Sequence, residues 1–322
     1  MNRNRTDLKI AESEAEWRRY HHENAGVRES AGLFFGAIKR SAVKRAGGMV
    51  KTVITSVKRA AFQPSYGDNR ENIVVSLTST GDRIRYIFPT LYSLAVQTRK
   101  PDLIVLWLGK NMNYPKRTID EIRALGIKVR FREDLGPNTK YYHAFGEYKN
   151  DLVVTVDDDI VYHKEMVEEL YGTYLKHPDS VIARRVNLMR FDRSKELLSY
   201  RDWIWEYRDA DGPSLVLLAT GVGGVLYPPA VLAFDCWKNR DFRSVCPSCD
   251  DIWLKFCQLS KGIKVCPVTG SKYPEDVINF LSQKTSLSAE NVDKGGNDEG
   301  IRACTEYFGM RDDLCERVLT DD

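Results

Sequence analysis

Three consecutive carboxylates, Asp157, Asp158 and Asp159, stand directly after an apolar run in the sequence DLVVTVDDDIVY. The run Leu152–Val156 is unbroken and rich in valine, which is typical of a strand buried on both faces of a parallel sheet. Adjacent carboxylates cannot remain in such surroundings without a cation, because burying unpaired charge costs too much free energy. The strand is therefore predicted to end at Asp157, with the acids at its carboxyl edge, where open α/β sheets bind ligands.

The chemistry that such a triplet favours is cation binding. Clustered carboxylate oxygens are the ligands that hard divalent cations such as Mg²⁺ and Mn²⁺ prefer, and these cations usually hold substrate phosphates as well. The triplet thus predicts a site for a metal and a phosphate. A solvated acidic turn is the alternative, since short motifs also occur by chance.

A second acidic pair, Asp250-Asp251, lies in the segment CPSCDDIWLKFCQL. The apolar residues that follow recur at helical spacing, so the pair is expected in the first turn of a helix, where the helix dipole favours carboxylates. An Asp in this position can simply cap the helix. If the pair lies within reach of the triplet, one of its carboxylates could instead act as general base for a sugar hydroxyl.

The elements that must position these acids alternate between strand and helix. The predicted elements are, in order, a strand over 73–77, a loop over 78–82, a helix over 83–98, a strand over 103–108, a helix over 116–125, a strand over 127–131, a strand over 152–156, a helix over 165–177 and a strand over 181–185. A further helix carries Lys140 near its start, after the turn Gly136-Pro137. This alternation predicts an α/β fold with a mostly parallel sheet and right-handed crossovers.

Three loops contain residues suited to ligands, each with a structural alternative. The hydroxyl-rich turn Thr78–Asp82 could hold phosphate through backbone N–H groups, but Ser and Thr are also ordinary helix caps. The glycines of ATGVGGVLYPP, including Gly223 and Gly224, could let the backbone approach a ligand or pack closely beneath a strand. Aromatic residues crowd the segment 190–213, where Trp203 could stack on a sugar or pack a lid onto the sheet.

The composition excludes several classes of function. The chain has 322 residues, 43% of them hydrophobic, and a formal net charge of +3. Residues 1–62 hold 13 Lys and Arg against 6 Asp and Glu, whereas the rest of the chain holds 35 against 39. A nucleic-acid enzyme is expected to carry positive charge across its body, so no nucleic-acid partner is expected. No secretory signal and no membrane-spanning run is visible, which predicts a cytoplasmic protein.

The basic excess lies in the segment 31–62, which contains seven basic and no acidic residues. Its apolar residues recur at helical spacing, with most of the basic ones on the other side. Such a helix could lie on an anionic membrane surface, placing the protein peripherally at the inner face of the membrane. It could equally pack on its own domain or on a partner subunit. We predict a helical N-terminal extension over 1–70 and a second domain over 71–322.

The cysteines allow a zinc site as one interpretation. Cys246 and Cys249 form a Cys-x-x-Cys half, and Cys257 and Cys266 follow, but Cys257 falls within a predicted helix and no second knuckle is present. A structural zinc site needs four convergent ligands. The alternative is that these are buried, reduced, apolar thiols.

Taken together, the motifs resemble one enzyme family. VTVDDDIVY after a fourth strand is similar to the DXD signature of nucleotide-sugar-dependent glycosyltransferases with the GT-A fold, and among these to the bacterial family-2-like enzymes of surface-polysaccharide assembly. Further segments fit the pattern in order: VVSLTSTGDRI, QTRKPDLIVLWL, GPNTKYYHAF, ATGVGGVLYPP, CDDIWL and GGND. The resemblance covers about residues 72–310. It implies a Rossmann-like, mostly parallel sheet flanked by helices.

The resemblance also implies how the donor is bound. The turn with Thr78, Ser79 and Arg83 would line the nucleotide pocket, and Lys140 would approach the nucleotide or its phosphates. Within the triplet, Asp157 and Asp158 would belong to the donor site, with Asp157 nearest the ribose.

The same resemblance assigns the metal and the acceptor. Asp159, with Asp157, would bind Mn²⁺ or Mg²⁺ at the diphosphate. The loop with Gly223 and Gly224, together with Trp203, would face the sugars.

For the reaction, the resemblance implies an acid of the second pair as base. Asp251 matches the usual catalytic base of inverting members, and Asp250 is the second candidate. His163 stands where proline is common in such sequences, and its role is open. The expected activity is transfer of a sugar from a nucleoside diphosphate sugar, in the first place a UDP-sugar, to a hydroxyl of a glycan or lipid-linked acceptor.

Three other functions stay open at this level. A retaining transferase would use the same donor site. A sugar-phosphate nucleotidyltransferase should show a Gly-rich basic loop after the first strand, which VVSLTSTGDRI lacks. A non-catalytic glycan-binding module would not need both acidic groups intact.

Overall fold

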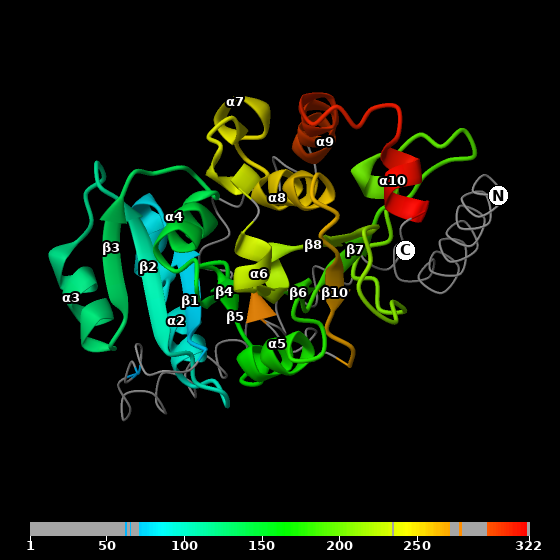
Figure 1. Ribbon diagram of the computed structural model, residues 1–322. Helices are drawn as coiled ribbons and strands as arrows, with labels where there is room; N and C mark the ends of the chain where they lie inside the picture. The colour runs from blue at the N-terminus through cyan, green and yellow to red at the C-terminus, as the bar shows by residue number, and fades with distance from the viewer. Residues whose placement is uncertain are drawn as a thin grey trace, which may run out of the picture.

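The computed structural model describes Phe62, Ser65 and residues 71–233, 235–270, 277–278 and 295–320 (Figure 1). The amphipathic segment up to residue 61 and nearly all of the predicted N-terminal domain therefore lie outside the described residues, as does the polar stretch 279–294. In the described part of the chain, no helix is both long and apolar enough to cross a membrane.

One seven-stranded sheet organises the described chain, in the order β10-β6-β9-β4-β1-β2-β3. All its strands run in the same direction except β9, which is antiparallel to both β4 and β6. Two short antiparallel pairs, β11 with β5 and β7 with β8, flank it. The strands are β1 Ile73–Thr78, β2 Leu103–Gly109, β3 Lys128–Arg132, β4 Leu152–Thr155, β5 Ile160–Val161, β6 Val181–Ala183, β7 Val186–Leu188, β8 Leu217–Ala219, β9 Val225–Tyr227, β10 Val265–Pro267 and β11 Val277–Ile278.

Helices cover both faces of this sheet (Figure 1). The α-helices are α2 Phe88–Ala95, α3 Lys116–Ala124, α4 Thr139–Glu147, α5 Met166–Tyr174, α6 Pro229–Leu232, α7 Phe242–Val245, α8 Asp250–Leu259, α9 Gly296–Tyr307 and α10 Leu314–Thr320. Four 3₁₀ helices join them: η1 Gly81–Tyr86, η2 Tyr200–Asp202, η3 Gly221–Gly223 and η4 Asp235–Lys238.

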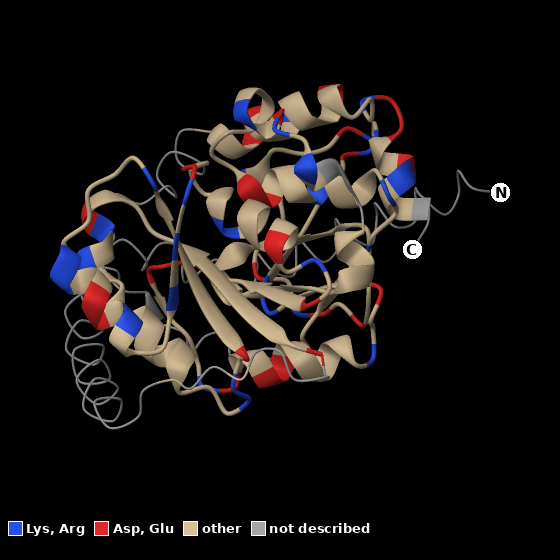
Figure 2. Ribbon diagram, turned by 60° about the vertical axis from the view of Figure 1, so that its left-hand side comes forward, with Lys and Arg blue, Asp and Glu red and all other residues tan. Residues whose placement is uncertain are grey.

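Alternation along the strands divides the core into two clusters. Val74 of β1 and Val153 of β4 face the cluster that contains residues of α4 and α8, whereas Val75 and Val154 face the cluster that contains residues of α2 and α5. The central strands β1, β2 and β4 carry no charged residue, whereas charges lie on the edge strand β3 and on the helices and loops (Figure 2). Burial on both faces explains the unbroken apolar runs of these strands.

The predicted α/β sheet is confirmed. Strands β1, β2, β3 and β4 are parallel neighbours, and the apolar run before the triplet forms β4 at the centre of the sheet. The mostly parallel sheet with flanking helices is the Rossmann-like arrangement that the GT-A resemblance implies.

The single helix predicted over 83–98 is wrong at both ends. The segment forms η1 and then α2, because Pro89 lacks an N–H and is tolerated only in the first turn of a helix. The helix also ends early, at Ala95, where the side-chain amide of Gln97 donates a 2.9 Å hydrogen bond to the carbonyl of Ser93. The shorter elements place Arg83 in η1, beside the carboxyl end of β4.

Candidate active site

The two acidic groups meet at one lysine. The triplet Asp157–Asp159 occupies the turn between β4 and β5, and Asp250 begins α8. The Nζ of Lys140 lies 2.6 Å from a carboxylate oxygen of Asp157 and 3.0 Å from one of Asp250. The acids therefore lie together at the carboxyl edge of the sheet although about ninety residues separate them in sequence.

A buried hydrogen-bond chain fixes Lys140. Its carbonyl, in the first turn of α4, accepts a 2.5 Å hydrogen bond from the Ser76 hydroxyl of β1, which accepts one of 2.8 Å from the indole of Trp107 of β2. Burial lowers the pKa of Lys140, but the negative charges of Asp157 and Asp250 raise it by more, so that it stands well above its ordinary value. Lys140 is thus a permanent cation held between the two acidic groups.

Asp158 is engaged on both carboxylate oxygens. Arg83 binds it with two nitrogens, and the hydroxyl of Ser79 donates a 2.5 Å hydrogen bond. The hydroxyl of Thr90 donates to its carbonyl at 3.0 Å. Asp158 therefore ties the turn after β4 to the loop after β1 and to α2.

The third carboxylate of the triplet, Asp159, has a looser partner. Its carboxylate lies 3.2 Å from the same terminal nitrogen of Arg83 that binds Asp158. Burial, followed by the charges of Asp157 and Asp158, raises the pKa of Asp159 to about 6, although Arg83 opposes this rise. Burial lowers the pKa of Arg83, and its bonds to the two carboxylates raise it above its ordinary value by a larger amount.

Asp251 contacts the loop that precedes β9. One of its carboxylate oxygens accepts a 3.0 Å hydrogen bond from the backbone N–H of Gly221. Burial and the neighbouring charge of Asp250 raise the pKa of Asp251 to about 7, although Lys140 lowers it. The pKa of Asp250 is also raised, chiefly by burial. A carboxyl group with a pKa near neutrality can take up and release a proton at physiological pH.

Gly221 lies at the centre of these side chains. A Cβ atom there would stand 3.0 Å from Nζ of Lys140 and 3.4 Å from carboxylate oxygens of both Asp157 and Asp251. The sequence marks Gly221 only as one glycine among three. Its position next to two acids depends on the reversed strand β9, which no local sequence pattern predicts.

The glycines predicted to face the sugars are closely packed. A Cβ atom at Gly223 would lie 2.9 Å from the backbone nitrogen of Arg185, and one at Gly224 would lie 3.2 Å from the sulfur of Met166. Gly224 also has a φ of +86°, which favours glycine. Close packing is therefore a sufficient reason for both residues.

Two other predicted residues make structural contacts. The hydroxyl of Thr78 donates a 3.1 Å hydrogen bond to the carbonyl of Trp107. Trp203, predicted to face the sugars, is only 3% exposed and packs against Tyr200 with ring centroids 5.1 Å apart. A ring buried in this way offers no face for a sugar, so the prediction for Trp203 is wrong; the aromatic cluster packs into the core instead.

The candidate zinc cysteines do not converge. Cys246, Cys249 and Cys257 belong to the core cluster on one face of the sheet, whereas Cys266 belongs to the cluster on the other face. All four are buried, and none of them forms a disulfide. They pack as apolar residues.

His163 joins a different group. Ligand atoms of His163, Glu165 and Glu169 all lie within 4.8 Å of one another. Glu169 is already paired, since Nε of Arg184 lies 2.7 Å from its carboxylate. This pairing lowers the attraction of the group for a cation.

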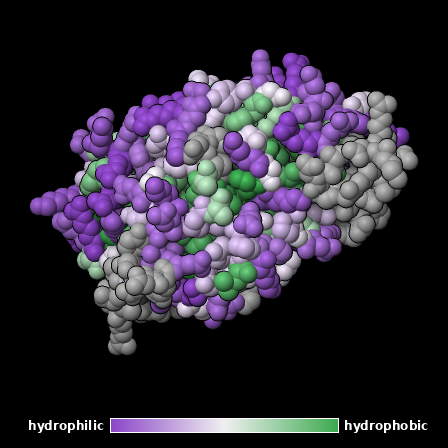
Figure 3. Space-filling view, in the orientation of Figure 1, coloured by the Kyte–Doolittle hydropathy of each residue, from purple (hydrophilic) through white to green (hydrophobic). Residues whose placement is uncertain are grey.

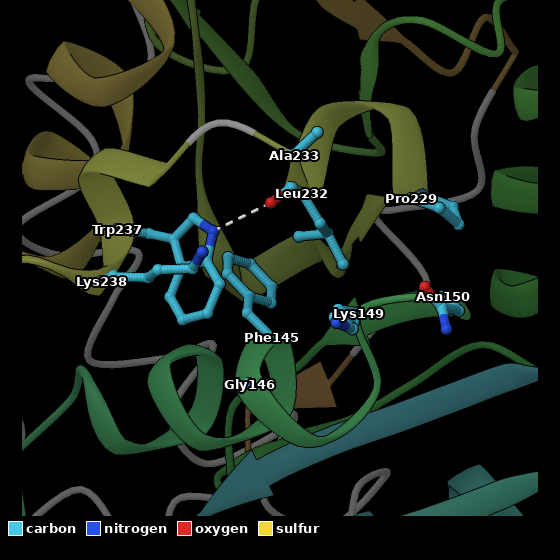
Figure 4. A pocket seen from close by; sticks show the side chains of 9 residues that line it. All are labelled: Phe145, Gly146, Lys149, Asn150, Pro229, Leu232, Ala233, Trp237 and Lys238. Atoms are coloured by element: carbon cyan, nitrogen blue, oxygen red, sulfur yellow. Dashed lines mark hydrogen bonds between the residues drawn. The ribbon is translucent and has the colours of Figure 1, made fainter.

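A separate pocket of about 440 Å³ lies on the face shown in Figure 4. Apolar residues gather near α6 in the middle of the face in Figure 3. The floor of the pocket is formed by Phe145, Leu232 and Trp237, whose indole donates a 3.1 Å hydrogen bond to the carbonyl of Leu232. None of the acids described above lines this pocket.

Comparisons with known proteins bear on the fold and the family. Residues 77–211 match the model of the family described as glycosyl transferase family 2. No curated protein matches the chain at a significant level.

Several solved structures are similar, at low sequence identity. A TarS fragment from S. aureus in complex with UDP is 16% identical over 62% of this chain and 58% of that chain, with a TM-score of 0.44. Glucosyl-3-phosphoglycerate synthase from Mycobacterium tuberculosis, in complex with Mn²⁺, UDP and glucosyl-3-phosphoglycerate, is 18% identical over 35% and 43%, with a TM-score of 0.30. 4-Diphosphocytidyl-2C-methyl-D-erythritol synthase is 9% identical over 70% and 98%, with a TM-score of 0.41. The chain thus spans less than two thirds of the first two proteins.

The family match runs from the end of β1 to the segment after η2 and so includes the acidic turn after β4. The sheet, with its single reversed strand, has the GT-A arrangement. The chain thus has the GT-A fold, and its residues 77–211 match glycosyl transferase family 2.

Proposed function

We propose that the protein transfers a sugar from a nucleoside diphosphate sugar, in the first place a UDP-sugar, to a hydroxyl of a glycan or lipid-linked acceptor. One observation carries the proposal: Lys140 joins the acidic turn after β4 to the acidic start of α8. A transferase needs a place for a departing anion and a base for an incoming hydroxyl, and these two acidic groups supply candidates for both.

The donor side fits a divalent cation by the chemistry of its ligands. Asp157 and Asp159 offer carboxylate oxygens on side chains that are 26% and 15% exposed, and oxygen ligands suit Mn²⁺ or Mg²⁺. These two residues would hold the ion. When bound, it would neutralise charge that gathers on the departing diphosphate.

The other donor residues act by position and charge. Arg83 presents a guanidinium whose planar fork suits phosphate as well as carboxylate, and Ser79 lies beside it on Asp158. From the resemblance, Thr78 and Lys140 are expected near the nucleotide too. The contacts of Lys140 favour a different task, because its Nζ is already shared by two carboxylates.

Asp251 is proposed as the general base. The N–H of Gly221 orients its carboxylate, and its pKa of about 7 suits removal of a hydroxyl proton near neutral pH. Asp250 is the weaker candidate, because Lys140 holds it. If the acceptor hydroxyl attacks the anomeric carbon as Asp251 takes its proton, the configuration at that carbon inverts.

A panel of nucleotide sugars, incubated with Mn²⁺ and with a chelator, tests the proposal. We expect release of nucleoside diphosphate from one donor class, dependent on the cation, and an inverted anomer by NMR. Asp159→Asn should lower this activity by at least about 100-fold. Asp120→Asn, on the exposed side of α3, is the matched control and should leave it unchanged. Metal-independent turnover, or full activity of Asp159→Asn, would contradict the donor assignment.

The N-terminal region carries a separate proposal. We propose that residues 31–62, with seven basic residues, hold the catalytic domain 71–322 peripherally on anionic membrane surfaces. Deleting residues 31–61, which keeps the buried Phe62, should release the protein from vesicles rich in phosphatidylserine and spare activity on a water-soluble acceptor. Failure of the intact protein to sediment with such vesicles would contradict it.

A further inference from the structure

One terminal nitrogen of Arg83 is shared by two carboxylates of the acidic turn. It binds an oxygen of Asp158 and lies 3.2 Å from an oxygen of Asp159, while Nε donates to the second oxygen of Asp158 at 3.2 Å. Arg83 is thus anchored in a fork on Asp158 and also contacts Asp159. Such forks resist displacement, because two parallel bonds must break together.

The anchor itself is rigid. Asp158 is 8% exposed, and Ser79 and Thr90 hold its side chain and its carbonyl. If Arg83 left Asp158, a buried carboxylate would lose its cationic partner, which costs free energy. The guanidinium therefore stays within contact range of Asp159.

A fixed guanidinium at this distance has two consequences for a cation bound by Asp159. It neutralises part of the carboxylate charge that attracts the cation, and it repels the cation directly. A diphosphate reverses both effects, since it adds negative charge between the two cations and can itself accept hydrogen bonds from the guanidinium.

We propose that Arg83 makes cation binding at Asp159 depend on the nucleotide, so that a divalent cation and a nucleoside diphosphate bind together and each binds weakly alone. Arg83 is a positioning and selectivity residue in this scheme: it suppresses unproductive cation binding. The inference rests on the proposed donor site. By linkage, the same coupling strengthens nucleotide binding by the cation.

The test is titration of Mn²⁺ followed by electron paramagnetic resonance of the free ion, with and without saturating UDP. For the intact protein we expect UDP to tighten Mn²⁺ binding by at least about tenfold. In Arg83→Gln, Mn²⁺ alone should bind about tenfold more tightly than in the intact protein, and the enhancement by UDP should fall below about threefold. Unchanged or weaker binding of Mn²⁺ alone by Arg83→Gln would overturn the inference.

Two further variants serve as controls for this experiment. Arg85→Gln removes the same charge from the same 3₁₀ helix, at a side chain that is 61% exposed and pairs with Asp82, and should leave Mn²⁺ binding unchanged. Arg83→Gln combined with Asp158→Asn removes the buried pair together, so it should fold if Arg83→Gln alone does not, and it should show the same loss of coupling. Retained coupling in the double variant contradicts the inference equally.

Failure of the inference and failure of the donor site give different results. If Asp159→Asn binds Mn²⁺ in the presence of UDP as tightly as the intact protein, the ion binds elsewhere and the donor site itself is wrong. If Asp159→Asn loses this binding but Arg83→Gln behaves like the intact protein, the donor site stands and only the role of Arg83 falls.

Discussion

The acidic turn after β4 and the acidic start of α8 both consist of aspartates, but these aspartates have different partners. In the turn, Arg83 is shared by Asp158 and Asp159 while Lys140 pairs with Asp157, so every carboxylate contacts a cation. At the start of α8, Lys140 contacts Asp250, and Asp251 has a backbone N–H as its polar partner. Burial and the neighbouring charge of Asp250 raise the pKa of Asp251 to about 7, which suggests a division of labour, with anion handling on one side and proton transfer on the other.

The largest effect is expected from a substitution of Asp251, which should abolish proton transfer alone. Asp251→Asn keeps the shape and an acceptor for the Gly221 N–H but cannot take a proton. We expect the transfer rate to fall by about 100- to 10,000-fold. UDP affinity, measured calorimetrically with Mn²⁺, should stay within about twofold. Equal loss of UDP affinity would show that the two acidic groups do not divide the work as stated.

Removing the shared cation should damage both groups. Lys140→Met leaves Asp157 and Asp250 without their common partner, and breaking a buried ion pair from one side costs roughly 3 to 5 kcal/mol. Urea unfolding followed by circular dichroism measures this loss. Lys140→Arg, which keeps the charge, should recover part of it. A Lys140→Met protein as stable as the intact one would remove Lys140 from its central position.

The pH dependence of the transfer rate tests the raised pKa of Asp251 directly. The base must be deprotonated, so the transfer rate should rise with pH and level off above about 7, the pKa of Asp251. Stability should move the opposite way. Because the folded-state pKa of Asp251 is raised above its unfolded value, the contribution of this group to stability is fully present below the unfolded pKa and is lost as pH rises through about 7. In Asp251→Asn this loss should vanish, which thermal unfolding between about pH 4 and about pH 8 would reveal.

The smallest expected effect concerns the glycine between the two groups. The Cβ of Gly221→Ala would stand 3.0 Å from Nζ of Lys140, so the lysine must shift by a few tenths of an ångström. We expect the transfer rate to fall by about tenfold with little change in unfolding free energy, because only the alignment of the acids changes. Gly172→Ala, at a position in α5 with open space around it, is the control. Equal rates for the two variants would show that the spacing is not critical.

The sequence predicted those features that a local pattern encodes. Apolar runs ending in acids identified β4 and its carboxyl edge, and helical spacing after Asp250 identified α8, because burial and the helix dipole act on neighbouring residues. The partner of both groups was harder to predict. Lys140 was expected at the nucleotide, but its carbonyl bond to Ser76 and its two carboxylate partners depend on contacts across the sheet.

Other errors have equally physical causes. The break of the helix near Pro89 follows from a missing N–H, which the apolar periodicity of the segment conceals. Trp203 stands among polar residues in sequence, but the tertiary fold buries its ring against Tyr200. Periodicity reports which side of an element is apolar; it does not report what a loop residue meets after the chain folds.

The reversed direction of β9 has a consequence for how the sequence of this protein can change during evolution. Because β9 starts at the edge where β4 ends, the loop before it reaches Asp251 without a crossover helix. The residues proposed for the donor side are complete by Asp159, well before that loop in the chain. Within the segment between β6 and β9, the loop 208–213 between β7 and β8 lies outside the buried core. This loop can therefore be exchanged or lengthened while the donor side is kept intact, which offers a route to new acceptors and a natural site for building chimaeras.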